Sequence, residues 1–134
     1  MRPKTLITGA TAAVAVLAMS AWAAVGHAAR AESRRAAAEM TGGDPDRGLV
    51  AVEAYGCGSC HAIPGVRGAA ARVGPSLDKV GTRAYVGGVL SDTPDHLVAW
   101  LRDPPAADPL TAMPNLHVTE PDARDIAAYL YTLR

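Results

Sequence analysis

The segment Cys57-Gly58-Ser59-Cys60-His61 holds the side chains of this chain that are best suited to chemistry. Two thiols three positions apart, with a histidine directly after the second, form the spacing at which a c-type haem is attached. Each sulfur can form a thioether bond to one haem vinyl group, and the histidine then lies beneath the iron as its first axial ligand. The motif therefore predicts one haem c, attached through Cys57 and Cys60, whose iron is bound by His61.

Two other chemistries also use a Cys-x-x-Cys pair. A thiol redox pair of the thioredoxin type needs a βαβ setting, and no strong strand pattern surrounds Cys57. A zinc site needs two further ligands. The chain has only two cysteines, and the histidines that could be recruited, His96 and His117, do not form a closely spaced pair. Both readings stay open beside haem attachment.

The sixth ligand of the iron is the next candidate. Met113 is the only methionine after residue 40, and it lies in a loop-like segment, Thr111-Ala112-Met113-Pro114. A thioether is a soft ligand, and Met/His ligation raises the reduction potential relative to bis-histidine ligation. We therefore predict Met113 as the second axial ligand, with His117, His96 or an open position as alternatives.

Three helices are expected to position these residues. The first begins at Asp44 as N-cap with Pro45 in the first turn, runs to about residue 55 and stops at Gly56. The second runs from about residue 94 to 102 behind Thr93, and the third from about 119 to 133. On the third helix an apolar stripe has helical spacing, formed by Ile126, Ala127, Leu130 and Leu133. The domain is therefore predicted to be all-α, with long Gly- and Pro-rich loops of the kind that pack around a cofactor.

The N-terminal segment predicts export. Arg2 and Lys4 form a basic start, and residues 5–29 contain no Asp, Glu, Lys or Arg. As a helix with a rise of about 1.5 Å per residue, this run is long enough to cross a hydrocarbon core of about 30 Å. Residues 1–29 are expected to be a retained signal-anchor, and a signal peptide cleaved after Ala23 or Ala28 is the alternative. Either reading places the rest of the chain outside the cytoplasm.

Composition divides the remainder into a linker and a domain. Residues 30–42 are rich in alanine with interspersed Arg and Glu, which predicts a polar helical stalk. Residues 43–134 are expected to form one domain. From Thr41 onward the chain has eight Lys and Arg against eleven Asp and Glu, a difference of −3. This mildly acidic balance argues against a nucleic-acid partner.

The order of helix, Cys-x-x-Cys-His, methionine loop and C-terminal helix resembles the class I (monohaem) c-type cytochromes over about residues 43–134. The resemblance implies the class I cytochrome c fold around one haem, with His61 and Met113 as axial ligands. The segment Gly74-Pro75-Ser76-Leu77 is similar to the Gly-Pro-x-Leu loop of that family. It implies that the carbonyl of Pro75 accepts the Nδ1–H of His61, whereas without the haem motif the segment reads as an ordinary turn.

The same resemblance assigns further roles. Trp100 and Tyr85 are similar in position to the aromatic residues that bind the haem propionates, and Arg83 could compensate their charge. Otherwise the two aromatics are simply packed side chains. Gly48 and Tyr129 are similar to the pair through which the first and last helices of the family cross, with Val52 beside them.

More narrowly, the chain resembles membrane-anchored bacterial cytochromes c that feed terminal oxidases, and residues 122–134 resemble cytochrome c domains fused to oxidase subunits. This implies an electron-transfer protein that cycles between Fe(II) and Fe(III) with no position for substrate, hence a carrier rather than an enzyme.

A respiratory donor complex and a terminal oxidase are the implied redox partners of a monomer or complex subunit. The implied location is the periplasmic side of the bacterial inner membrane, either anchored or soluble after cleavage. The alternatives are a fixed haem subunit of a larger membrane oxidoreductase, and a small haem enzyme or sensor with a labile sixth ligand.

Overall fold

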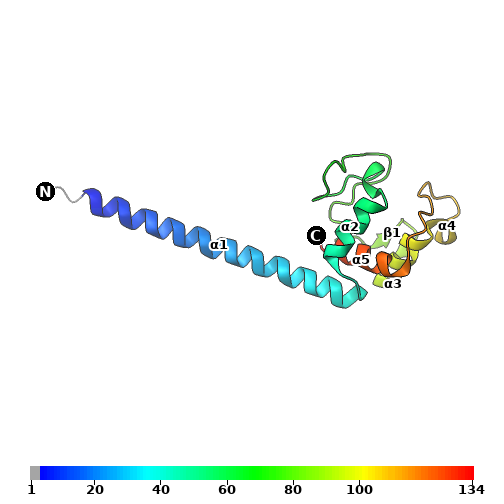
Figure 1. Cartoon of the computed structure of the whole chain (residues 1–134), viewed down its shortest axis with the longest axis horizontal. Helices are drawn as coiled ribbons and strands as arrows, with labels where there is room; N and C mark the ends of the chain where they lie inside the picture. The colour runs from blue at the N-terminus through cyan, green and yellow to red at the C-terminus, as the bar shows by residue number, and fades with distance from the viewer. Residues whose placement is uncertain (1–3) are drawn as a thin grey trace. The chain divides into compact units, whose positions relative to one another are not determined.

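The computed structural model describes residues 4–134 (Figure 1), and Arg2 of the predicted signal lies outside the described residues. The chain divides into two units, one ending at Ser33 and one spanning Arg34–Arg134. The elements, in chain order, are the helices α1 (Lys4–Thr41) and α2 (Pro45–Ala54), the 3₁₀ turns η1 (Cys57–Ser59) and η2 (Val80–Thr82), the strands β1 (Tyr85–Val86) and β2 (Leu90–Ser91), and the helices α3 (Pro94–Arg102), α4 (Pro104–Ala107) and α5 (Glu120–Tyr131).

Helix α1 contains a segment, Ala12–Thr41, that is long and apolar enough to cross a membrane by length and composition. In the structure, none of the residues in the most apolar part of this segment is buried. Large side chains such as Leu17 and Trp22 are exposed instead. An exposed apolar helix of this length has the surface that a lipid environment would cover.

The predicted helix starts are confirmed. Asp44 caps α2 by accepting the N–H of Asp46 at 2.8 Å, and Thr93 and Thr119 cap α3 and α5 in the same way. Helix α2 ends before Gly56, whose φ of 69° requires the left-handed conformation that glycine adopts without strain. In each case the capping residue and a proline lie within three residues of one another, so the beginning of the helix could be predicted from the local sequence.

Helix α5 ends at Tyr131, two residues earlier than predicted. The N–H groups of Thr132 and Leu133 bond to the carbonyls of Tyr129 and Leu130, three residues back, at 2.9 and 3.0 Å. This i→i−3 pattern tightens the last turn into 3₁₀ geometry, as often happens at helix ends. The apolar stripe itself is confirmed: its residues on α5 are buried in the core, and Leu133 packs against that core.

The all-α prediction is wrong in one respect, because the mostly helical fold includes a small antiparallel sheet. Tyr85 pairs with Ser91 and Val86 with Leu90. The turn between the strands contains Gly87 and Gly88, both at positive φ, which lets the chain reverse within three residues. The pair Gly87-Gly88 was the sequence signal from which this hairpin could have been predicted. The short helix α4, in a region expected to be loop, begins with prolines at positions where a helix needs no N–H donor.

The predicted crossing of the first and last helices of the domain is present, and α2 and α5 share the most extensive contact between elements (Figure 1). A Cβ atom built on Gly48 would lie 1.9 Å from the carbonyl oxygen of Asp125 and 2.8 Å from Cβ of Tyr129. Val52 lies one turn further along α2 and is buried. Glycine is therefore required at the crossing, because any side chain would push the two backbones apart.

The last turns of α1, from Arg34 onward, pack into the compact unit. Ala37 and Thr41 are fully buried there, and the carbonyl of Thr41 accepts a bond of 3.1 Å from Arg124. A Cβ atom on Gly43 would lie 2.2 Å from the carbonyl oxygen of Arg124 on α5. The close approach of Gly43 and the burial of Thr41 attach this end of α1 to α5.

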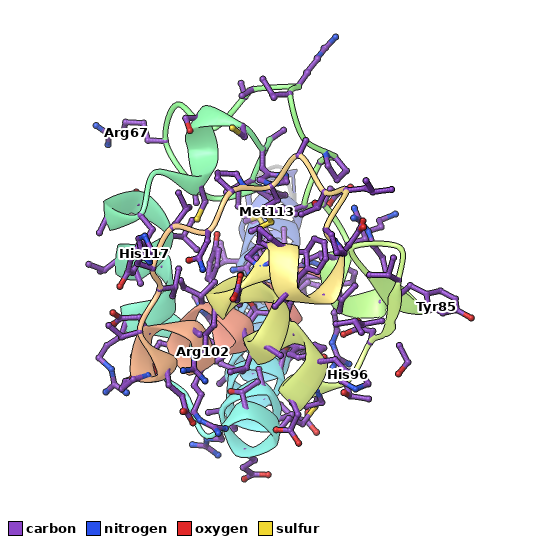
Figure 2. The ribbon with its side chains drawn as sticks, turned by 90° about the vertical axis from the view of Figure 1, so that its right-hand side faces the viewer. Arg67, Tyr85, His96, Arg102, Met113 and His117 are labelled. Carbon is purple, nitrogen blue, oxygen red and sulfur yellow. The ribbon has the colours of Figure 1, made fainter. Side chains whose placement is uncertain are left out.

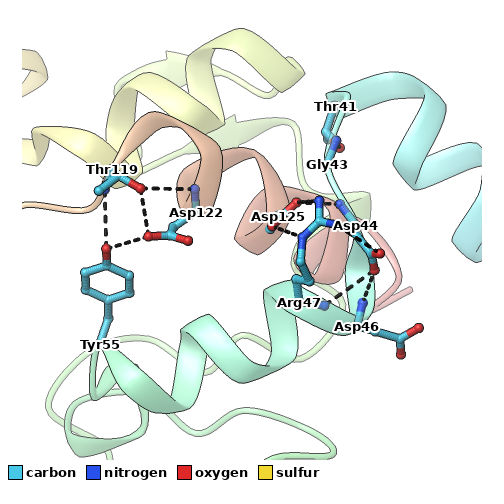
Figure 3. Close-up of polar contacts among 9 residues, drawn as sticks. All are labelled: Thr41, Gly43, Asp44, Asp46, Arg47, Tyr55, Thr119, Asp122 and Asp125. Atoms are coloured by element: carbon cyan, nitrogen blue, oxygen red, sulfur yellow. Dashed lines mark hydrogen bonds and ion pairs between the residues drawn. The ribbon is translucent and has the colours of Figure 1, made fainter.

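A buried carboxylate links α2 to α5 (Figure 3). Asp125 accepts the backbone N–H of Asp44 at 2.6 Å, and two guanidinium bonds from Arg47 at 2.7 and 3.0 Å. These bonds hold the pKa of the Asp125 carboxyl below its ordinary value of 3.8. The charged form of Asp125 therefore stabilises the helix crossing.

Replacing Asp125 by asparagine is expected to lower the free energy of unfolding by about 1.5–3 kcal/mol at neutral pH, the range for hydrogen bonds to a charged group. Because its folded-state pKa is lowered, this contribution is fully present above the unfolded-state pKa and is lost as the pH falls through the folded-state pKa. Urea unfolding of the full chain in detergent, between pH 7 and pH 2, measures both effects.

The control is Asp46→Asn, which removes an exposed carboxylate paired with Arg34 at 2.5 Å. Exposed pairs contribute little, so this variant should keep the acid dependence of the wild type. Parallel acid curves for Asp125→Asn and the wild type would show that Asp125 does not stabilise the crossing through its charge.

Candidate functional site

A cavity of about 570 Å³ lies in the compact unit and is walled mainly by apolar side chains. Its volume falls within the range of about 300–1,000 Å³ that is usual for small-molecule and cofactor sites. All eight residues that the sequence analysis assigned to the cofactor line this one cavity: Cys57, Cys60, His61, Pro75, Arg83, Tyr85, Trp100 and Met113. They come from five separate segments of the chain.

The turn η1 brings the thiols and the imidazole to one wall. The N–H groups of Cys60 and His61 both point back to the carbonyl of Cys57, at 3.3 and 3.0 Å. Both cysteines are free thiols of intermediate burial. A single turn of chain thus presents two sulfurs and one imidazole ring to the same space.

The His61 ring is held from behind by the loop that contains Pro75. The carbonyl oxygen of Pro75 lies 2.7 Å from Nδ1, and a Cβ atom on Gly74 would lie 2.5 Å from Cε1 of the ring. Only glycine allows the loop to approach so closely. A carbonyl at this distance favours the tautomer with the proton on Nδ1, which leaves the lone pair of Nε2 available to a metal.

Met113 comes from the loop between α4 and α5. Its backbone N–H bonds to the hydroxyl of Thr111 at 3.2 Å, which shapes the loop locally. Figure 2 shows Met113 near the centre of the view, with His96 and His117 towards its edges. Neither histidine lines the cavity; both lie along a separate open groove beside Arg102. The alternative axial ligands are therefore away from the cavity wall.

The three residues expected near the propionates differ in their settings. Trp100 is 7% exposed and lies against the hairpin, where a Cβ atom on Gly87 would be 2.4 Å from its ring. Tyr85 also lines the cavity but is 63% exposed, at the edge of the view in Figure 2. The guanidinium of Arg83 donates to the backbone carbonyls of Ser76 and Asp78, and so braces the loop that holds His61.

Sequence reasoning missed a polar pair at this cavity. Asp92 lines it and accepts a hydrogen bond of 2.6 Å from the hydroxyl of Tyr131 on α5. Burial and this bond raise the pKa of Tyr131 well above its usual range. The two residues are 39 positions apart, so no local pattern could have connected them.

Two tyrosines outside the eight predicted cofactor residues join the Cys57–His61 segment to α5. Tyr129 donates to the carbonyl of Pro64 at 2.7 Å, just after the motif. Tyr55, just before it, donates to the carboxylate of Asp122 at 2.8 Å, as Figure 3 shows. The hydroxyl of Thr119 donates to that same carboxylate and accepts the N–H of Asp122. The segment that carries the thiols is thus attached to α5 on both sides.

The thiols, imidazole and thioether around the cavity fit a haem c better than they fit a zinc site or a thiol redox pair. Across residues 4–134, no group of three or more His, Cys, Asp or Glu side chains is placed to hold a metal ion, as zinc would need. Burial raises the pKa of the Cys57 thiol, which is opposite to the activation of a redox-active thiolate. Two thiols, an imidazole and a thioether around an apolar cavity fit a porphyrin attached by thioethers.

No protein-family model matches the chain, and no solved structure matches it. Among curated proteins it is similar to cytochrome c oxidase subunit 2 of Alkalihalophilus pseudofirmus, with 32% identity over 90 residues, 66% of this chain and 25% of the relative. The protein of the same name from Bacillus sp. strain PS3 is 33% identical over 82 residues, 58% of this chain and 23% of the relative. The one from Bacillus subtilis is 35% identical over 77 residues, which are 56% of this chain and 22% of the relative. The chain thus spans about a quarter of the length of these relatives.

These relatives correct one prediction. From the sequence, the chain is predicted to be a carrier rather than an enzyme, because a six-coordinate iron has no position for substrate. The relatives are instead named as subunits of an oxidase, which is an enzyme. The iron site alone does not decide this point, because an enzyme complex can contain a subunit whose own part is electron transfer.

Proposed function

We propose that this chain is the haem c-carrying electron-transfer component of a membrane-bound respiratory oxidase. Its homology to oxidase subunit 2 supports a respiratory electron-transfer role. The observation that carries the haem assignment is the convergence of Cys57, Cys60, His61 and Met113 on one apolar cavity. The class I cytochrome c fold is part of this proposal, since helix α2, the motif, the methionine loop and α5 follow in that order.

In this proposal each residue of the site has a distinct task. Cys57 and Cys60 hold the cofactor covalently, so that it stays in place through repeated exchange of electrons. His61, oriented by the carbonyl of Pro75, and the thioether of Met113 would hold the iron, and the haem would supply the one-electron couple. The apolar wall excludes water and so strengthens every electrostatic interaction within the cavity.

Helix α1 is the membrane anchor in this proposal, and the compact unit lies on the periplasmic side. A respiratory donor and the catalytic part of the oxidase are the partners. Electrons enter and leave near Cys57 and the loop of residues 62–67, which is close to the surface. Redox contacts are small, below about 1,200 Å², and confinement by an anchor raises the effective concentration of the partner.

Covalent haem attachment is the first expected result. The full chain, produced in a host with c-type haem assembly, should retain haem through denaturing electrophoresis, because thioether bonds survive unfolding. The double variant Cys57→Ala/Cys60→Ala should retain none. Haem-stained gels and the pyridine haemochrome spectrum measure attachment.

The matched control is Ser59→Ala, which lies between the cysteines and carries no thiol. It should retain haem as the wild type does. A wild-type chain that leaves the assembly host without covalent haem would overturn the proposal. If haem is attached, the proposed electron-transfer role can be tested with membranes that contain the oxidase. The reduced chain should then be oxidised by oxygen.

A further inference from the structure

The hydroxyl of Tyr55 lies at a junction between two segments of the site (Figure 3). Tyr55 follows the last residue of α2, and Gly56 alone separates it from Cys57. Its hydroxyl donates to the carboxylate of Asp122 at 2.8 Å and accepts the backbone N–H of Thr119 at 3.4 Å. A side chain beside the two thiols is therefore bound to residues 64 and 67 positions further along the chain.

The methionine loop, residues 108–118, has few contacts of its own that hold Met113 at the cavity. Within residues 4–134, every hydrogen bond formed by residues 109–117 goes to another residue of this loop. Leu110, three positions before Met113, is 94% exposed. The position of Met113 therefore depends on the packing of its side chain and on how the two ends of the loop are held.

The two ends of the loop are held differently. At the first end, the N–H of Asp108 bonds to the carbonyl of Pro104 at 3.0 Å, in the adjoining helix α4. At the second end, Thr119 forms three hydrogen bonds, one with Tyr55 and two with Asp122. The first contact joins neighbours in the sequence, whereas the second joins the loop to the segment that carries the thiols and the imidazole.

We propose that Tyr55 is a positioning residue for the predicted sixth ligand: its hydroxyl holds the end of the methionine loop, and so keeps the thioether of Met113 in the cavity. The inference rests on the proposed function. Loss of the hydroxyl breaks the direct hydrogen-bonded link between the segment with His61 and the segment with Met113. The thioether then leaves its place more often, and an added ligand can replace it.

The charge of Asp122 strengthens this junction. Its carboxylate accepts the hydroxyl of Thr119 at 2.7 Å and that of Tyr55 at 2.8 Å, and these bonds hold its pKa below the ordinary value of 3.8. Hydrogen bonds to an ionised acceptor are about twice as strong as those between neutral groups. The ring of Tyr55 packs against the core, so phenylalanine can keep the packing while the hydroxyl is lost.

The test is the rate at which saturating imidazole displaces Met113 from the oxidised, membrane-anchored holoprotein, followed by the loss of the weak far-red band. Tyr55→Phe should raise this rate at least about tenfold, the factor to which the loss of one hydrogen bond to a charged group corresponds. The second readout is amide hydrogen exchange, followed by mass spectrometry. It should be faster over residues 111–119 in Tyr55→Phe than in the wild type, because the end of the loop opens more often.

The matched control is Thr132→Val, which removes a hydroxyl from the other end of α5. That hydroxyl donates to the carbonyl of Tyr129 at 2.6 Å and is outside the cavity lining. Thr132→Val should keep the displacement rate and the exchange pattern of the wild type.

A second comparison asks whether Tyr55 acts through Met113. When Met113→Ala is already present, Tyr55→Phe should not change the rate of imidazole binding, because there is no thioether for the loop to hold. A general loosening of the cavity would instead speed imidazole binding in both backgrounds.

The outcomes separate this inference from the one beneath it. A wild-type chain without covalent haem refutes the proposed function. Attached haem with equal displacement rates in the wild type, Tyr55→Phe and Thr132→Val refutes the positioning role alone. Equal acceleration by Tyr55→Phe with and without Met113 refutes it too, because the effect then comes from a looser cavity. Unchanged hydrogen exchange over residues 111–119 in Tyr55→Phe also refutes it, whether or not that variant attaches haem.

Discussion

Met113→Ala in the haem-loaded chain is expected to lower the midpoint potential by more than about 59 mV, a tenfold change for one electron. A soft thioether stabilises Fe(II) relative to Fe(III), and its loss removes that preference. The sixth position then opens to water or to an added ligand. The weak far-red band of the oxidised protein should disappear, and carbon monoxide should shift the spectrum of the reduced variant. Redox titration and optical spectra measure these changes.

The control for this prediction is Met40→Ala, which removes a thioether from the end of α1, away from the cavity lining. Its potential and spectra should match those of the wild type. A wild type that already binds carbon monoxide would contradict the assignment of Met113. Retention of the far-red band in Met113→Ala would mean that another group occupies the sixth position.

Gly48→Val is expected to destabilise the compact unit by about 3 kcal/mol or more, at the upper end of the cost of overpacking. The first added carbon already lies 1.9 Å from the carbonyl oxygen of Asp125. That neighbour is backbone, so α2 and α5 must separate. For a unit of about 100 residues, the loss corresponds to a fall in Tm of at least about 12 °C. Thermal unfolding followed by circular dichroism measures it.

The control is Val50→Ala, on the same helix, where the native side chain is 65% exposed. It should change the stability by less than about 0.5 kcal/mol, as most substitutions on the surface do. An unchanged Tm in Gly48→Val would show that the crossing is looser than its geometry indicates.

The separation of these helices should also reach the cavity. Ile126 and Leu130 of α5 line it, as does Val52 of α2. If Gly48→Val still attaches haem, its carbon monoxide binding should therefore increase over that of Val50→Ala. The reason is that α5 forms part of the cavity wall, so its displacement loosens the cavity that the predicted ligands share.

Much of the local structure followed from neighbouring residues. The caps at Asp44, Thr93 and Thr119 and the stop at Gly56 could be read because each involves groups only a few positions apart. The hairpin at residues 85–91 was missed although it has a local signal in Gly87-Gly88. A two-residue strand is too short to show an alternating pattern, and its pairing is stabilised by packing against Trp100.

The sequence by itself determined the chemistry of the site, because two thiols and an imidazole within five residues bring the same groups together in any fold that forms the turn. Only the tertiary structure decided which distant groups face that motif. It placed Met113 on the cavity, left His96 and His117 on a separate groove, and brought Asp92 to Tyr131. The physical reason is that these groups lie far apart along the chain and meet only where the packing of the helices brings their segments together.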